Sequence, residues 1–106
     1  MEQLDPVALK SHLESKPRDV LLLDVREPWE YERCRIEGSV NVPLARVPDA
    51  TDIWGTAREV VVICHHGMRS YQAGILLERA GVERVVNLAG GIDAWAQSVE
   101  PNMPRY

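Results

Sequence analysis

One cysteine lies where the sequence can turn a thiol into a nucleophile. Cys64 follows an apolar run at residues 60–63 and precedes a short loop, residues 65–70, that leads into an amphipathic run. Backbone N–H groups in a tight loop at a helix start can converge on one point, and the helix dipole adds positive potential there. A thiol at that point is expected to ionise readily, and the thiolate is the reactive form. The segment therefore predicts a nucleophile inside an anion-binding loop.

An arginine in the same loop gives the nucleophile a cationic neighbour. Arg69 lies five residues after Cys64, so one tight loop can present both side chains. A guanidinium binds anions through paired N–H groups. A metal site formed by Cys64, His65 and His66 is the alternative. Adjacent histidines on a tight loop rarely point at one ion, and the sequence has no further ligand cluster, so we expect no metal.

Hydrophobic periodicity indicates the elements that position this loop. Continuous apolar runs predict strands buried on both faces, and helical patterns alternate with them. This alternation predicts an α/β domain with a largely parallel sheet. Ligand sites of such sheets lie outside the carboxyl ends of the strands. Asp24, Asn41 and Cys64 are at or near such ends in the predicted strands, and the turn at Gly90 and Gly91 is expected to lie beside them. The expected strands are residues 20–23, 39–42, 60–63 and 84–88. The expected helices are residues 6–15, 28–33, the run after Ser70 to residue 80, and 92–98. Short helical turns are expected within residues 44–56.

Composition restricts the class of protein. The 106 residues suit one domain, and 45% hydrophobic with 26% charged residues is typical of globular proteins. A formal net charge of −4 argues against a nucleic acid or a membrane surface as the main partner. Two cysteines, no apolar leader and no apolar run of about 20 residues indicate a reduced, cytoplasmic protein.

Other residues near the expected site have supporting or structural interpretations. Asp24 is expected to pair with a nearby arginine or to cap a loop, rather than to act as a base. Arg26 either adds positive potential at the site or only braces its loop. The three tryptophans, Trp29, Trp54 and Trp95, are expected to pack. A solvated face is expected from the charged side chains of Glu27, Glu30, Glu32, Arg33 and Arg35.

Four segments, taken together in this order and spacing, resemble the single-domain rhodaneses, which are sulfurtransferases. The segments are residues 24–31, 36–44, 64–70 and 87–95. The resemblance implies a central, mostly parallel five-stranded sheet flanked by helices on both faces. It implies one domain over residues 1–106, with a motif-bearing core at about 20–98 and an irregular tail at 99–106.

The resemblance also implies an activity and its residues. Sulfane sulfur passes from thiosulfate or a similar donor to a thiophilic acceptor, either cyanide or a thiol, through a persulfide on Cys64. No cofactor is implied. Arg69 is expected to attract the anionic donor, and Ser70 to cap the next helix and reach the sulfur. The loop residues expected to hold the persulfide are His65, His66, Gly67, Met68, Arg69 and Ser70.

Loop length separates this interpretation from its nearest rival. Cysteine phosphatases that share the architecture have the arginine six residues after the cysteine, and the shorter spacing here suits a sulfur-sized anion. Mercaptopyruvate users carry a small neutral loop, whereas this loop keeps Arg69. Many thiosulfate users carry a cation directly after the cysteine, so His65 and His66 predict poorer use of thiosulfate.

Alternatives remain open at this point. The chain is either a sulfurtransferase of small molecules, a relay module that delivers sulfur to a partner protein, or an inactive binding domain. Cys34 and Arg35 replace the Gly-His usual in the family. Cys34 is then either structural or a thiol that resolves the persulfide of Cys64.

Overall fold

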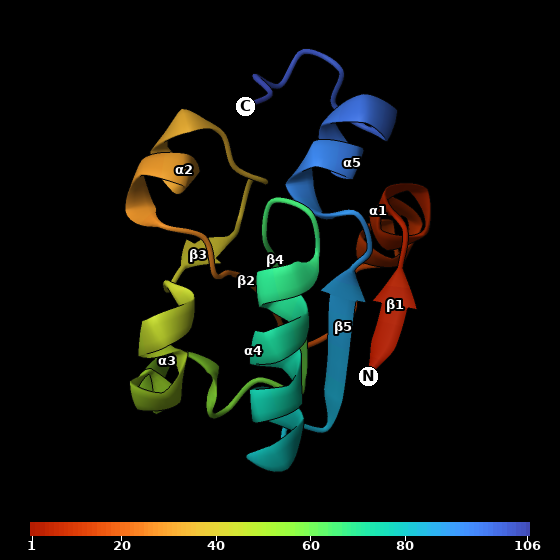
Figure 1. Cartoon of the computed structure of the whole chain (residues 1–106). Helices are drawn as coiled ribbons and strands as arrows, with labels where there is room; N and C mark the ends of the chain where they lie inside the picture. Colours follow the sequence, from red (N-terminus) through yellow and green to blue (C-terminus); the bar gives the residue numbers. More distant parts are fainter.

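The five strands form a single sheet in which every neighbouring pair is parallel, in the order β1-β5-β4-β2-β3 (Figure 1). The computed structural model describes residues 1–106. The expected α/β fold with helices on both faces of a five-stranded sheet is confirmed. The strands are β1 (Glu2–Leu4), β2 (Val20–Asp24), β3 (Val40–Asn41), β4 (Glu59–Ile63) and β5 (Arg84–Leu88). The helices are α1 (Pro6–Glu14), α2 (Pro28–Arg33), the 3-10 helix η1 (Leu44–Asp49), α3 (Thr51–Trp54), α4 (Met68–Arg79) and α5 (Gly91–Ser98).

The central strand β4 shows why the apolar runs are continuous. All five of its residues are buried. Val60 and Val62 face one core with α4, η1 and α3, and Val61 and Ile63 face the other with α1 and α5. Side chains alternate across a strand, so a strand covered on both faces must be apolar at successive positions.

Strand β1 is absent from the sequence-based expectations. Its three residues pair with β5 at the sheet edge, and only Leu4 is partly buried. A segment this short has no readable period, and tertiary pairing alone makes it a strand.

The start of α4 differs from the expectation of a helix after Ser70. The helix begins at Met68, and Gly67 is its N-cap residue with a φ of 103°. A positive φ is readily adopted by glycine, which lets the chain turn sharply from the cysteine loop into the helix. The Cys64 loop is therefore shorter than predicted, and Arg69 and Ser70 belong to the first helical turn.

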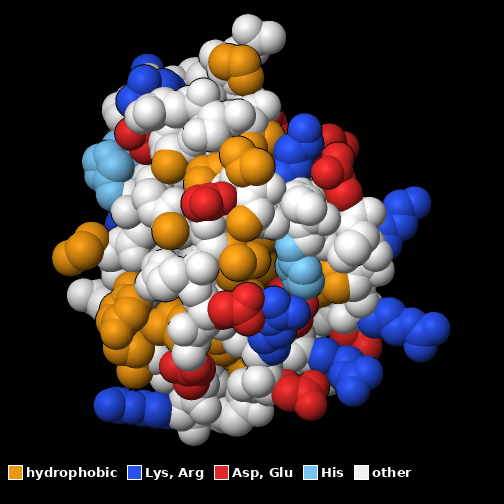
Figure 2. All heavy atoms as spheres, turned by 90° about the vertical axis from the view of Figure 1, so that its right-hand side faces the viewer, with side chains coloured by type: hydrophobic (Ala, Val, Ile, Leu, Met, Phe, Trp, Pro, Cys, Tyr) orange, Lys and Arg blue, Asp and Glu red, His pale blue; other side chains and the backbone are white.

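The tail at residues 99–106 is irregular, as predicted, and packs on the domain. Val99, Met103 and Tyr106 pack against the core that holds α1 and α5. Figure 1 shows the tail leaving α5 and running back toward α2. On the face shown in Figure 2, Lys and Arg side chains are interspersed with Asp and Glu. None of the helices has the length and apolar character that a membrane crossing requires.

Candidate active site

Cys64 lies directly after β4 at the carboxyl edge of the sheet. Cys64 is 1% exposed. The Gly67 N–H donates to the Cys64 Sγ at 3.0 Å, and the Ser70 Oγ lies 3.2 Å from the same sulfur. Gly67 supplies the one loop amide that hydrogen-bonds this sulfur. The expected group of amides around an outer persulfide sulfur stays a prediction.

Ser70 reaches the sulfur as expected, but it does not cap the helix. It sits inside the first turn of α4, and its hydroxyl donates to the Asn87 Oδ1. The Asn87 side chain in turn donates to the Gly67 carbonyl at 3.2 Å. Asn87 was not singled out from the sequence for this role. An amide within the apolar run at residues 85–88 of β5 is the signal that could have found it, because buried polar groups need partners.

The Gly90–Gly91 turn and the first residues of α5 hold the other side of the loop. The Ile92 N–H donates to the Cys64 carbonyl at 2.8 Å, and the Asp93 N–H donates to the His65 carbonyl at 3.1 Å. A side chain at Gly91 would collide with the His65 carbonyl. The expectation that the Gly90–Gly91 turn joins the site is confirmed by these contacts.

Arg69 is held by a carboxylate rather than free. Its Nη1 and Nη2 donate to the two Glu30 carboxylate oxygens at 2.6 and 2.9 Å. Glu30 is 4% exposed, so the prediction that it belongs to a solvated face is wrong. Its side chain turns inward from α2 because Arg69, its capping-box partner Glu27 and Tyr106 all donate to it. The hydrogen bond from Arg69 is the main reason that the pKa of Glu30 falls to about 2.

The lowered pKa of Glu30 predicts a pH-dependent contribution to the free energy of unfolding. A pKa of about 2 in the folded state against an ordinary value of 4.5 means that Glu30 stabilises the fold above pH 4.5. That contribution disappears as the pH falls from 4.5 to 2. We expect Glu30→Gln to lower the free energy of unfolding by about 2 kcal/mol at neutral pH. Urea unfolding across this pH range should show the difference from wild type shrinking.

The control for that experiment is Glu83→Gln. Glu83 pairs with Arg58 at 3.6 Å, and both side chains are mostly exposed. We expect this variant to differ little from wild type at any pH. A Glu30→Gln deficit that stays constant as the pH falls would contradict the assigned role of the ionised carboxylate.

Asp24 and Arg26 form a buried ion pair beneath the site. Both side chains are 0% exposed, and the Arg26 Nη2 donates to the Asp24 Oδ2 at 2.7 Å. Asn41 donates to both of their carbonyls, so it links β3 to this turn. Burial disfavours the Arg26 charge, but hydrogen bonds to Asp24 and Tyr106 more than offset it and raise its pKa. Arg26 therefore braces the β2–α2 turn and adds no exposed charge at the site.

The two histidines lie together with Asp93, and one potential ligand atom from each of the three lies within 4.8 Å of the others. The His65 and His66 rings stack with centroids 4.0 Å apart and planes 21° apart. Nitrogen lone pairs of nearly parallel rings do not point at one ion, and the nearby Asp93 carboxylate is bound by Arg105 at 2.9 Å. Burial, followed by the proximity of His66, lowers the pKa of His65, which favours its neutral form.

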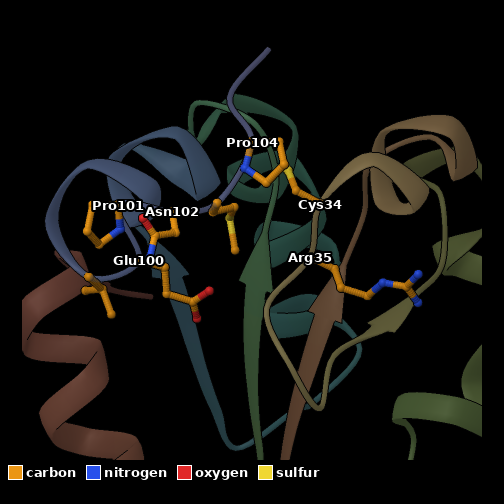
Figure 3. Close-up of a pocket in the computed structure, with 8 residues that line it drawn as sticks. Cys34, Arg35, Glu100, Pro101, Asn102 and Pro104 are labelled. Carbon is orange, nitrogen blue, oxygen red and sulfur yellow. The ribbon is translucent and has the colours of Figure 1, made fainter.

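Cys34 lies beside residues 99–104 of the tail. It lines a hollow of about 520 Å³ together with tail residues, and Figure 3 shows Pro104 beside it. It is 8% exposed, and its sulfur accepts a long contact of 3.8 Å from the Arg26 Nη1. The two cysteines are free. Of the tryptophans, Trp54 and Trp95 are buried as expected, whereas Trp29 is 61% exposed and packs against the Tyr106 ring.

Comparisons with known proteins agree with this geometry. A family model described as a rhodanese-like domain matches residues 5–98. A sulfurtransferase of Allochromatium vinosum is 37% identical over 97 residues, which cover 92% of this chain and 90% of that protein. The adenylyltransferase and sulfurtransferase MOCS3 of Drosophila ananassae is 31% identical, and the match covers 99% of this chain but 25% of that protein.

A solved structure supports the same assignment. The crystal structure of a rhodanese-related protein from Thermoplasma volcanium superposes with a TM-score of 0.80 at 29% identity, covering 95% of this chain and 96% of that one. The family match spans most of the chain, including both the cysteine loop and the strands that position it. The chain belongs to the rhodanese-like domain family.

Proposed function

We propose that this chain transfers sulfane sulfur from thiosulfate, or a donor of the same kind, to cyanide or a thiol through a persulfide on Cys64. Sulfur transfer in general is supported by the family and by a relative named as a sulfurtransferase. The observation that carries the proposal is the Cys64 sulfur held by the Gly67 amide, in a loop that leads directly into the helical turn carrying Arg69.

The proposed reaction has two displacements. The Cys64 thiolate attacks the outer sulfur of thiosulfate, the sulfur–sulfur bond of the donor breaks, and sulfite leaves with the bonding pair. The product is a Cys64 persulfide anion. The acceptor then attacks the outer sulfur, and the Cys64 thiolate leaves. Cyanide becomes thiocyanate, and a thiolate becomes a persulfide. The Gly67 amide donates to this sulfur, which lies beside the start of α4.

Arg69 is suited to orient a donor rather than to draw it from a distance. Its ion pair with Glu30 offsets its charge and uses two of the five guanidinium N–H groups, which leaves three for a ligand. Hydrogen bonding to Glu30 raises the pKa of Arg69, so the guanidinium stays charged. A fixed fork of donors costs less ordering on binding than a mobile one.

Arg69→Ala should therefore affect donors according to their charge. We expect kcat/KM for loading from thiosulfate to fall about tenfold to a hundredfold, the cost of one or two hydrogen bonds to a charged ligand. Loading from a neutral organic persulfide should fall much less. The rate of persulfide formation, measured with each donor in samples quenched at successive times, gives the difference.

Two further variants control for that result. Arg79→Ala removes an exposed arginine from the last turn of the same helix and should change neither donor. Arg69→Lys keeps the charge and avoids leaving Glu30 unpaired, but it loses the fork, so thiosulfate use should remain impaired. Equal losses with both donors in the Arg69 variants would contradict the assigned role.

A second candidate function is a sulfur relay to a partner protein. It is favoured by the charge balance at the site: Arg69, Arg26 and Arg105 are each paired with a carboxylate, so little free positive charge attracts a dianion. The match to a longer adenylyltransferase and sulfurtransferase is consistent with this candidate. Slow thiosulfate turnover combined with fast transfer to a protein thiol would favour the relay.

Intact mass spectrometry tests the proposal. Protein treated with thiosulfate should gain one sulfur atom and lose it on addition of cyanide. Because Cys64 is almost fully covered, loading needs local opening and should be followed over time. No gain from thiosulfate, but a gain from a cysteine desulfurase and its substrate, would select the relay. No gain from either would reject sulfur transfer. Release of phosphate from p-nitrophenyl phosphate would favour phosphatase chemistry instead.

A further inference from the structure

A tyrosine from the tail is inserted between α2 and the Cys64 loop. The Tyr106 ring stacks on the His65 ring, with centroids 4.1 Å apart and planes 12° apart. The Trp29 and Tyr106 rings also meet edge to face, with centroids 5.7 Å apart and planes 67° apart. Trp29 belongs to α2 and His65 follows Cys64, so one side chain of the tail contacts both walls of the site. Aromatic contacts of this kind fix the position of the Tyr106 hydroxyl.

The hydroxyl of Tyr106 joins two charged groups. It accepts a hydrogen bond from the Arg26 Nη1 at 2.8 Å and lies 2.9 Å from the Glu30 Oε2. A guanidinium can only donate, so the hydroxyl hydrogen must point to Glu30. Burial is the main reason that the pKa of Tyr106 rises to about 12, which keeps this donor protonated at neutral pH.

Glu30 links the Tyr106 hydroxyl to Arg69. Its Oε2 accepts from both the Tyr106 hydroxyl and the Arg69 Nη2, at 2.9 Å each. Its Oε1 accepts from the Glu27 N–H and the Arg69 Nη1. A carboxylate bound at both oxygens has one orientation, and a bidentate partner inherits that orientation. The tail hydroxyl is thus one of three sources of hydrogen bonds that fix the carboxylate facing Arg69.

We propose that Tyr106 is a positioning residue of the sulfur-transfer site: its hydroxyl fixes the Glu30 carboxylate, and the fixed carboxylate orients Arg69 beside Cys64. The proposal rests on the proposed function, because the role of Arg69 is defined there by the donor. It extends the site beyond residues 20–98, the motif-bearing core, into a tail that the motifs leave out.

Tyr106→Phe tests the proposal, because it removes the hydroxyl and keeps the ring on His65. We expect the KM for thiosulfate to rise several-fold, up to about tenfold, with kcat nearly unchanged. Loading from a neutral organic persulfide and discharge by cyanide should keep their wild-type rates. A merely structural role of Tyr106 would lower all of these rates together with the folded fraction.

Tyr31→Phe is the matched control. The Tyr31 hydroxyl is also part-buried and also hydrogen-bonded, but its partner is the Ser39 carbonyl, away from the loop. The Tyr31→Phe variant should lose a similar amount of stability, and its KM for thiosulfate and its loading from a neutral organic persulfide should stay unchanged. Equal KM values for thiosulfate in Tyr106→Phe and Tyr31→Phe would overturn the proposal.

A readout without sulfur transfer separates this proposal from the proposed function. The groups facing Glu30 are Arg69 from α4, Tyr106 from the tail, Arg26 from the β2–α2 turn and His65 from the loop. Carbon-13 NMR of the Glu30 carboxyl, followed as the pH is lowered, should show its pKa rising from about 2 toward 4.5 in Tyr106→Phe but not in Tyr31→Phe.

If the wild type loads no sulfur, the proposed function fails, and the titration still decides whether Tyr106 fixes Glu30. An unchanged Glu30 pKa in Tyr106→Phe would overturn the positioning role even in an active enzyme.

Discussion

Cys64→Ser should gain no sulfur from thiosulfate under conditions that load the wild type. The expected loss is complete, because a serine oxygen cannot form a persulfide and a serine hydroxyl is far less acidic than a thiol. The serine oxygen can keep the hydrogen bond from the Gly67 amide, so the loop should retain its shape. Intact mass before and after thiosulfate, followed by cyanide, measures the result.

Cys34→Ser is the matched control for this experiment. Cys34 is buried beside the tail and its sulfur contacts the Arg26 Nη1, whereas Cys64 contacts Gly67 and Ser70. We expect Cys34→Ser to load sulfur at close to the wild-type rate. A loaded Cys64→Ser protein would refute the assigned nucleophile. An internal disulfide formed by the persulfide of the wild type, and lost in Cys34→Ser, would assign Cys34 the resolving role.

Asp24→Ala should lower the free energy of unfolding by about 3–5 kcal/mol. The Asp24 carboxylate accepts from the Arg26 backbone N–H, Nε and Nη2, and both side chains are completely buried. Removing the carboxylate leaves a buried guanidinium with the Glu30 and Cys34 carbonyls and the Tyr106 hydroxyl, and no balancing charge within direct contact. Urea unfolding monitored by tryptophan fluorescence measures the loss.

Two variants make this prediction decisive if Asp24→Ala folds poorly. Asp24→Asn keeps an oxygen acceptor but loses the charge, so it should cost less than alanine. Glu83→Ala breaks the exposed pair with Arg58 and should cost no more than about 1 kcal/mol. If Asp24→Ala and Glu83→Ala lost equal stability, the buried pair would not be a main support of the β2–α2 turn.

The α/β fold and the position of the proposed nucleophile follow from local sequence. The buried strands carry apolar residues at successive positions, as β4 does at residues 60–63. The loop after β4 then places Cys64 at the carboxyl edge of the sheet. The spacing of Cys64 and Arg69 and the position of the Gly90–Gly91 turn are also local features. These are set by chain periodicity and by backbone conformation, which a sequence displays directly.

The surroundings of the nucleophile depend on contacts between distant segments. Glu30 reads as one charge of a solvated helix until Arg69, 39 residues later, turns it inward. Asn87 becomes a loop support only when β5 lies beside β4, and β1 becomes a strand only by pairing with β5. Tyr106 reaches Arg26 across 80 residues of sequence, through an irregular tail that carries no period.

The sequence by itself determined which side chain we propose as the nucleophile, because Cys64 and its loop are contiguous in the chain. The tertiary structure decided which charges near Cys64 are neutralised and which groups orient Arg69. Ion pairs and buried hydrogen bonds depend on distances of a few ångströms between side chains, and sequence separation says nothing about those distances.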